Sequence, residues 1–154
     1  MAAVVFEIRE MTAQDYEEVA RLWRNTEGIG LDDGTDTREG IAAYLARNPG
    51  LSYVARHEGR VVGAVLCGHD GRRGYLHHLA VAQAHRQNGI GRALVEACLV
   101  KLGSIGIQKR NIFLFSDNEP GEEFWKHIGW NERGDLKVLQ KPTPSGCSGI
   151  KSTR

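Results

Sequence analysis

Residues 75–95 combine two hydrophobic patterns around a glycine-containing turn. Leu76, Leu79 and Val81 suit a buried strand. Apolar residues then recur at helical spacing, at Ile90, Leu94, Ala97, Cys98 and Leu102. The segment therefore predicts a strand, a tight turn and the start of a helix. This arrangement constrains the fold more than any other stretch of the chain.

The predicted helix begins beside two glycines, Gly89 and Gly91. A helix start carries free backbone N–H groups and the positive end of the helix dipole, so it attracts anions. Because glycine lacks a Cβ, a phosphate can approach its backbone closely. One interpretation is a phosphate site on the amides from Asn88 to Ala93. The other is that the glycines only form a tight turn.

Two motifs carry a resemblance to a known family. Arg86-x-x-Gly89-x-Gly91 resembles the Arg/Gln-x-x-Gly-x-Gly/Ala signature of the GNAT superfamily of acyl-CoA-dependent N-acetyltransferases. The segment from Asn118 to Trp130 resembles that family's Asn-x-x-Ala-x-x-Phe-Tyr-x-x-x-Gly-Phe segment. Two motifs in this order, about 30 residues apart, are more specific than either alone.

The resemblance implies acetyl-CoA as co-substrate and assigns its binding residues. The pyrophosphate would lie on the loop formed by Arg86, Gln87, Asn88, Gly89, Ile90, Gly91, Arg92 and Ala93. The strand residues Leu79, Ala80 and Val81 would bind the pantetheine arm through their backbone. One of their N–H groups would point at the thioester oxygen, which requires no side chain. Asn118 and Trp125 complete the set of cofactor-binding residues.

His77 is the candidate catalytic residue. Its strand resembles the His-x-His-Ala-Leu-Ala-Val strand of the arylalkylamine N-acetyltransferases, whose second histidine serves as a base, and the first falls at Tyr75. Imidazole titrates near neutral pH and suits a base that takes a proton from an ammonium. The alternative is that His77 and His78 are ordinary strand residues. In a regular strand they would point to opposite faces of the sheet.

Trp125 occupies the position where many family members carry a tyrosine that protonates the leaving thiolate. An indole N–H cannot replace that acid, so no general acid is assigned. We expect Trp125 to pack beside the pantetheine arm or in the core. His127 is expected on the surface of the same helix.

The remaining pattern predicts a mixed α/β (α+β) sheet in the order β-α-α-β-β-β-α-β-α-β-β, which matches the GNAT fold. The expected strands are 4–9, 51–57, 60–68, a strand from Tyr75, 109–115, and a closing hairpin of 130–133 and 136–140. The expected helices follow Thr12, follow Asp36 or Thr37, start at Ile90, and follow Asp117 or Asn118. A splayed central sheet is implied by the resemblance alone.

Length and composition fit one globular domain, here predicted over residues 1–141, with 142–154 as a mobile tail. The net charge of +1 and the lack of a long basic run give no reason to expect nucleic acid or a membrane surface as partner. Three widely spaced cysteines argue against disulfides and a zinc site, so no metal is expected. We see neither a signal peptide nor about 20 consecutive apolar residues, and predict a cytoplasmic location.

The leading functional hypothesis is direct acetyl transfer from acetyl-CoA, in a ternary complex, to a primary amine of a small molecule or a protein. On the family pattern, the first two helices and their connection form one wall of the acceptor site. Asp32, Asp33 and Asp36 in that connection would attract a cationic amine, or would act only as turn formers and caps. A homodimer is one possible assembly.

Two alternatives compete with this hypothesis. One is a non-catalytic, coenzyme A-binding regulatory module. The other is a dinucleotide-binding domain, which is disfavoured because Leu94 interrupts the Gly-x-Gly-x-x-Gly pattern and hairpins precede it.

Overall fold

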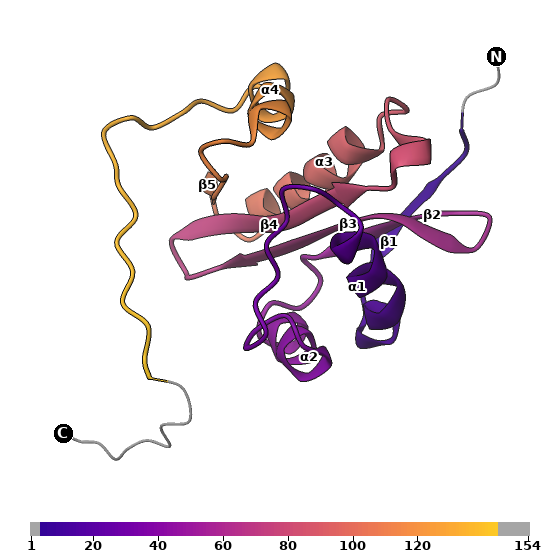
Figure 1. Cartoon of the computed structure of the whole chain (residues 1–154), viewed down its shortest axis with the longest axis horizontal. Helices are drawn as coiled ribbons and strands as arrows, with labels where there is room; N and C mark the ends of the chain where they lie inside the picture. Colours follow the sequence, from indigo (N-terminus) through magenta and orange to yellow (C-terminus); the bar gives the residue numbers. More distant parts are fainter. Residues whose placement is uncertain (1–3, 145–154) are drawn as a thin grey trace.

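The computed structural model describes residues 4–144 (Figure 1). Its strands are β1 (Glu7–Glu10), β2 (Tyr53–His57), β3 (Arg60–His69), β4 (Arg73–Val81) and β5 (Lys109–Ile112). Its helices are α1 (Tyr16–Arg24), α2 (Arg38–Arg47), α3 (Ile90–Ser104) and α4 (Glu119–His127). Single 3-10 turns at Ala13–Asp15 and Gln83–His85 precede α1 and α3. The predicted mixed α/β (α+β) sheet is confirmed.

The strands form one sheet in the order β1-β2-β3-β4-β5. Neighbours from β1 to β4 are antiparallel, whereas β4 and β5 are parallel and pair only from Arg73↔Lys109 to Leu76↔Ile112. β4 continues beyond this point to Val81. β4 and β5 therefore separate, and within residues 4–144 the edge of β4 that faced β5 has no strand partner from His77 onward. This is the splay that the family resemblance implied.

Two hydrophobic cores fill the two faces of the sheet. On one face, α3 and α4 cover what we call the α3-side core, which includes Val65, Leu76, Leu94 and Trp125. On the other, α1 and α2 cover the α1-side core, which includes Trp23, Ile41, Ala64 and Ala80 (Figure 1). β4 contributes to both cores because alternate side chains of a strand point to opposite faces.

A β-bulge interrupts that alternation in β4. Leu66 pairs with His77 and Ala64 pairs with Ala80, so two residues of β4 lie opposite one residue of β3. His78 takes up the extra length with a positive φ of 55°. As a result His77 and His78 both face the α1 side, where they meet aromatic rings of α2 and α1. The prediction that they point to opposite faces is wrong, because a bulge breaks the period of two.

Several predicted bounds and one predicted element need correction. β2 begins at Tyr53 rather than at residue 51, and β4 begins at Arg73 rather than at Tyr75. The first strand begins at Glu7, since Val5 is 80% exposed and pairs with no strand. The strand predicted over 109–115 ends at Ile112, where it parts from β4. The closing hairpin is absent: within the described residues, 130–144 contain no strand. Most of the predicted mobile segment 142–154 lies outside the described residues.

Candidate active site

The first turn of α3 has an open N-terminus. Its N-cap, Gly89, adopts the left-handed conformation with φ 81° and offers no side-chain acceptor. Among the described residues, Ala93 is the first residue of this helix start whose N–H forms a backbone hydrogen bond; it donates to the Gly89 carbonyl at 3.0 Å. The preceding amides, those of Ile90, Gly91 and Arg92, are therefore available to an anionic ligand.

The starts of α2 and α4 are closed by side chains instead. The Thr37 hydroxyl accepts from the Gly40 N–H, and the Asn118 side-chain oxygen accepts from the Gly121 N–H, both at 3.0 Å. The sequence offered Asp36 or Thr37 for α2 and Asp117 or Asn118 for α4, and Thr37 and Asn118 are the caps that form. Among the helix starts of α2, α3 and α4, only that of α3 combines free amides with a residue lacking a side chain.

The two glycines of this turn have different roles. A Cβ on Gly89 would meet no atom within 4 Å, so its open side faces free space. A Cβ on Gly91 would lie 3.2 Å from the Phe124 ring and 3.6 Å from Val81. Gly91 therefore allows α4 to pack closely against α3, and substituting it would disturb this packing as well as any ligand.

Side chains of the preceding loop hold its shape. Arg86 Nε donates to the Val81 carbonyl at 2.9 Å, which ties the loop to the end of β4. Asn88 Nδ2 donates to the carbonyls of His85 and Arg86. Gln87 has a positive φ of 65°. The loop thus uses these side chains for its own structure and presents backbone to the outside.

His77 lies at the point where β4 and β5 separate. Its ring stacks on Tyr75 at 6.3 Å between centroids and also contacts Phe113 at 6.1 Å and Tyr44 at 6.4 Å. Burial among these rings lowers the pKa of His77 below its usual 6.5, the charge of His78 lowers it further, and Asp36 opposes both effects. The imidazole is consequently neutral at neutral pH and able to accept a proton.

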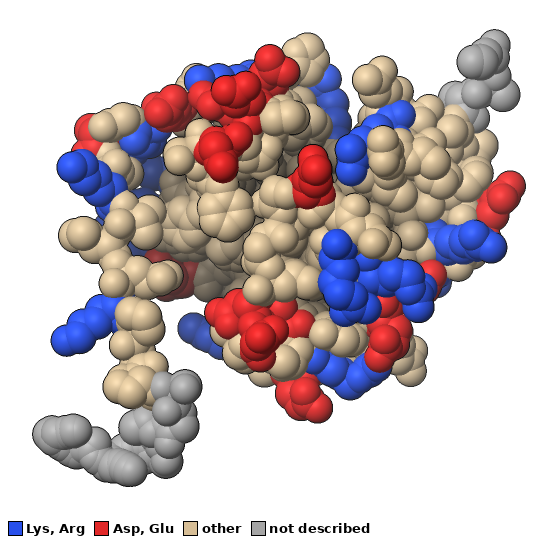
Figure 2. Space-filling model, in the orientation of Figure 1, with Lys and Arg blue, Asp and Glu red and all other residues tan. Residues whose placement is uncertain are grey.

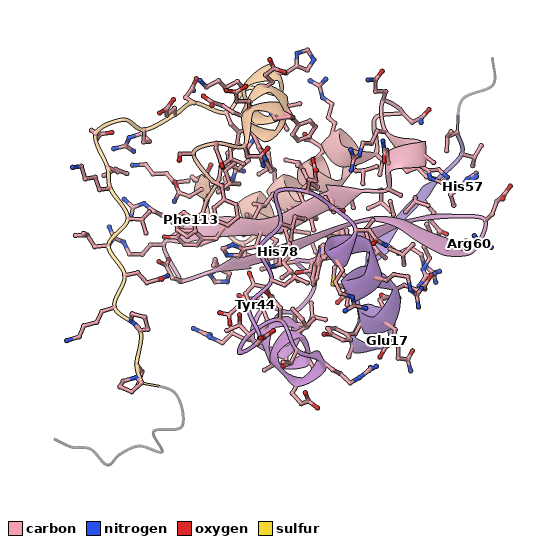
Figure 3. The ribbon with its side chains drawn as sticks, viewed as in Figure 1. Glu17, Tyr44, His57, Arg60, His78 and Phe113 are labelled. Carbon is pink, nitrogen blue, oxygen red and sulfur yellow. The ribbon has the colours of Figure 1, made fainter. Side chains whose placement is uncertain are left out.

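His78 forms a largely buried hydrogen bond with Asp36. Its Nε2 lies 3.1 Å from Asp36 Oδ2, and the two side chains are only 20% and 9% exposed. Figure 3 shows His78 on β4. Asp36 also accepts the Asp32 N–H through the same oxygen, and its carbonyl accepts the Tyr16 hydroxyl. Trp23 Nε1 donates to the His78 carbonyl at 2.8 Å. The α1–α2 connection is thereby fastened to the bulge of β4.

Sequence reasoning missed this pair because His78 was expected on the other face of the sheet. Asp36 was named as a candidate helix cap, the alternative to Thr37, and with its neighbours as a possible attractor of cations. Asp32 and Asp33 are exposed, so the three aspartates differ. The sequence set Asp36 apart from Asp33 only as a candidate cap, and nothing in it indicated the contact with His78, which depends on the bulge.

The start of α4 borders the same region. A Cβ on Gly28 would lie 2.7 Å from Asn118 Nδ2, and one on Gly30 would lie 3.1 Å from Phe115. The α1–α2 connection therefore reaches across from the bulge to the β5–α4 connection. In Figure 2 Asp and Glu side chains gather over α4, while the middle of the visible face is mostly uncharged.

Trp125 is only 8% exposed and belongs to the α3-side core. Its ring packs edge-on against Trp130 at 4.9 Å and Phe124 at 5.4 Å. This position favours the core alternative for Trp125. His127 is exposed as predicted. Among the residues that the structure describes, no cluster of His, Cys, Asp or Glu could hold a metal ion, and no helix could span a membrane.

Comparison with known proteins identifies the family. A model described as the acetyltransferase (GNAT) family matches residues 11–130. The chain belongs to the GNAT acetyltransferase family. It is an acyl-CoA-dependent acetyltransferase, as its relatives' names also indicate.

Curated relatives cover nearly the whole chain. An acetyltransferase of Sodalis glossinidius is 31% identical over 135 residues, which is 88% of this chain and 94% of the relative. One of Photorhabdus laumondii is 35% identical over 133 residues, covering 86% and 92%. Solved structures support the GNAT fold.

Two of those structures contain coenzyme A or an analogue. The PaiA N-acetyltransferase of Thermoplasma acidophilum, in complex with coenzyme A, has a TM-score of 0.73 at 17% identity, covering 82% of this chain and 90% of its own. AAC(6′)-Iy with a coenzyme A bisubstrate analogue also reaches 0.73, at 16% identity and 90% and 99% coverage.

Proposed function

We propose that this GNAT enzyme transfers an acetyl group from acetyl-CoA directly to a primary amine, of a small molecule or an exposed protein group, within a ternary complex. The observation that supports the proposal is the arrangement of three features along the gap between β4 and β5. The open first turn of α3, the unpaired edge of β4 and the His77 ring follow one another along the gap between β4 and β5.

The donor would bind chiefly to backbone groups. The pyrophosphate fits the amides of Ile90, Gly91 and Arg92, where the helix dipole adds positive potential. The pantetheine arm fits the edge of β4 at Leu79–Val81, which offers hydrogen-bonding groups without a strand partner. Asn118 lies at the other side of the gap. These contacts place the thioester, which supplies an activated acetyl group, near His77.

His77 would act as the base. As the amine nitrogen bonds to the acetyl carbon and the carbon–sulfur bond breaks, one amine proton passes to His77 Nδ1 or Nε2. A free N–H at the edge of β4 would polarise the carbonyl oxygen. Solvent protonates the departing thiolate, since the buried Trp125 offers no acid.

The α1–α2 connection would form the acceptor wall. Asp36 is fixed by His78 and contributes a negative charge close enough to influence His77. A cationic amine approaching His77 would therefore be attracted to this side of the gap. The cytoplasmic location stays a prediction from the sequence, and the regulatory-module alternative has no observation in its favour.

The test is release of free thiol from acetyl-CoA across a panel of small amines and lysine-containing or N-terminal peptides. We expect acceptor-dependent thiol release, intersecting initial-velocity patterns, and no mass increase when the protein is incubated with acetyl-CoA alone. A covalent acetyl-protein formed without acceptor that then passes its acetyl group to the amine would contradict direct transfer. Tight coenzyme A binding without thiol release on any acceptor would favour the non-catalytic alternative.

A further inference from the structure

Two phenylalanines follow β5 along the gap and remain exposed. Phe113 is 62% exposed and Phe115 59% exposed. Their neighbours Ile112 and Leu114 pack against the α3-side core, whereas among residues 4–144 Phe113 and Phe115 belong to neither core. Because side chains alternate along an extended segment, both phenyl rings point to the α1 side, where His77 lies.

These rings continue an aromatic surface that starts at His77. Phe113, labelled in Figure 3, lies 6.1 Å from the His77 ring and 5.8 Å from the Tyr75 ring, between centroids. A Cβ on Gly30 would lie 3.1 Å from the Phe115 ring, so the α1–α2 connection runs against this ring. We call Tyr75, Phe113 and Phe115 the aromatic strip. The strip leads from His77 toward solvent, beside the expected acceptor wall.

The charges on this side of the gap match a single ammonium group. Asp36 is 9% exposed, and its charge acts on the pKa of His77. Asp32 uses its carboxylate inside the connection, where it accepts the Gly34 N–H at 2.7 Å. The rings of the strip carry no charge, and the middle of the face in Figure 2 is mostly uncharged. One buried carboxylate therefore lies near His77, with uncharged rings beyond it.

We propose that the acceptor is a primary amine with an uncharged, apolar body, whose amino group lies between Asp36 and His77 while its body lies along the aromatic strip. This inference rests on the proposed acetyl transfer and adds the class of amine. An apolar body on Phe113 and Phe115 removes both surfaces from water, which stabilises the complex. A body with a second charge would lose hydration against these rings without gaining a partner.

The first experiment measures kcat/KM for linear primary alkylamines from ethylamine to octylamine at saturating acetyl-CoA. Each added methylene should raise kcat/KM about two- to fourfold until the strip is covered, because each is removed from water. Hexylamine should exceed 1,5-diaminopentane, which has the same chain length and a second ammonium, by about tenfold or more. A series that is flat with chain length, or a preference for the diamine, would overturn the proposal.

The second experiment shortens the strip by Phe113→Ser and Phe115→Ser. In each variant the ratio of kcat/KM for hexylamine to that for ethylamine should fall about tenfold. Both amines are compared on the same protein, so any effect on the His77 base or on folding cancels in the ratio. The control Val100→Ser changes an equally exposed apolar residue of α3 (61% exposed) and should keep the wild-type ratio. A wild-type ratio in both strip variants would reject the strip as the binding surface.

Failure of the proposed function gives a different result. Turnover of all the amines with no dependence on chain length rejects the apolar body and leaves acetyl transfer intact. If no amine is acetylated, acetyl transfer fails, and calorimetry of the same amines with the coenzyme A complex then decides the inference. Affinity that rises with chain length in the wild type and not in Phe115→Ser supports the strip. Absent or length-independent binding overturns it.

Discussion

The two sides of the gap between β4 and β5 are built differently. On the α3 side, the free groups are backbone amides at Ile90–Arg92, and the side chains of Arg86 and Asn88 hold the loop. On the α1 side, the groups available for chemistry are side chains: His77 among aromatic rings, and Asp36 paired with His78. The α3 side depends on the conformation of the backbone, whereas the α1 side depends on the identity of its side chains.

This difference explains why the two sides are unequally visible in a sequence. A backbone site needs glycines at particular places, which leaves a motif. A side-chain site assembled from α2, β4 and a connection leaves less: the strand motif indicated His77, but no motif joined Asp36 to His78. The difference between the two sides also predicts that mutations on each side affect different steps. Changing backbone conformation should damage donor binding, while isosteric side-chain changes should affect the acceptor step.

The largest expected effect is on acetyl-CoA affinity in Gly89→Val. Left-handed backbone costs a β-branched residue about 1–3 kcal/mol of stability, and the side chain would occupy the space a phosphate needs. We expect affinity to fall by about 100-fold or more, because several hydrogen bonds to a charged group are lost at about 1.5–3 kcal/mol each. Isothermal calorimetry measures this directly.

The matched control is Gly106→Val, near the other end of α3. Gly106 also has a positive φ, 85°, and open space at its Cβ. It should lose similar stability while keeping normal affinity. Equal loss of affinity in the two variants would mean that strain, not the open helix start, governs binding.

Next in size is the effect of His77→Ala on turnover. Removing a general base should lower kcat by roughly 10²-fold, with acetyl-CoA affinity close to that of the wild type. The exposed His127→Ala serves as control. A wild-type rate in His77→Ala would remove this residue from the mechanism.

The pH dependence sharpens this prediction. Burial holds the pKa of His77 below 6.5, so activity should fall only as the pH drops below that value, and this acidic limb should vanish in the variant's residual activity. Because the unfolded chain binds this proton more readily, the free energy of unfolding should also decrease as the pH falls through the same range.

The sequence predicted the local features of the fold and the site, and missed the features that depend on contacts between distant parts of the chain. Thr37 and Asn118, each one of two cap residues that the sequence offered, and the glycine turn that starts α3 are local features, and the sequence indicated them. The His78 bulge was not predictable, because a period of two carries no mark of an inserted residue. The closing hairpin was expected from two strand-like runs, 130–133 and 136–140, around Gly134-Asp135, but strand character in a segment says nothing about its partner.

A smaller effect is expected from Asp36→Asn, which keeps the shape of the side chain and removes its charge. The KM for the amine should rise about tenfold, since a hydrogen bond to a charged group contributes about 1.5–3 kcal/mol. The KM for acetyl-CoA should stay constant. Asp33→Asn, at an exposed position of the same connection, should change neither constant. A parallel rise in both KM values for Asp36→Asn would mean that the two sides are not separable.

The smallest effect is expected at Trp125. If it serves only the α3-side core, Trp125→Phe should cost about 1–3 kcal/mol of stability through lost packing and leave the pH profile of turnover unchanged. Measuring acetyl-CoA affinity beside turnover distinguishes a displaced thioester from a lost proton donor. A basic limb that disappears with fold and affinity intact would show that the indole supports a donor.

The central claim is that the donor binds to backbone amides at the start of α3 and along the free edge of β4. The most direct test is to record backbone amide NMR shifts while coenzyme A is added to the wild-type protein. The account predicts that the largest shifts occur at Ile90–Arg92 and Leu79–Val81, with little change at the side-chain-capped starts of α2 and α4 beyond Asn118 itself. Saturable binding that leaves the amides of Ile90–Arg92 unmoved would contradict it.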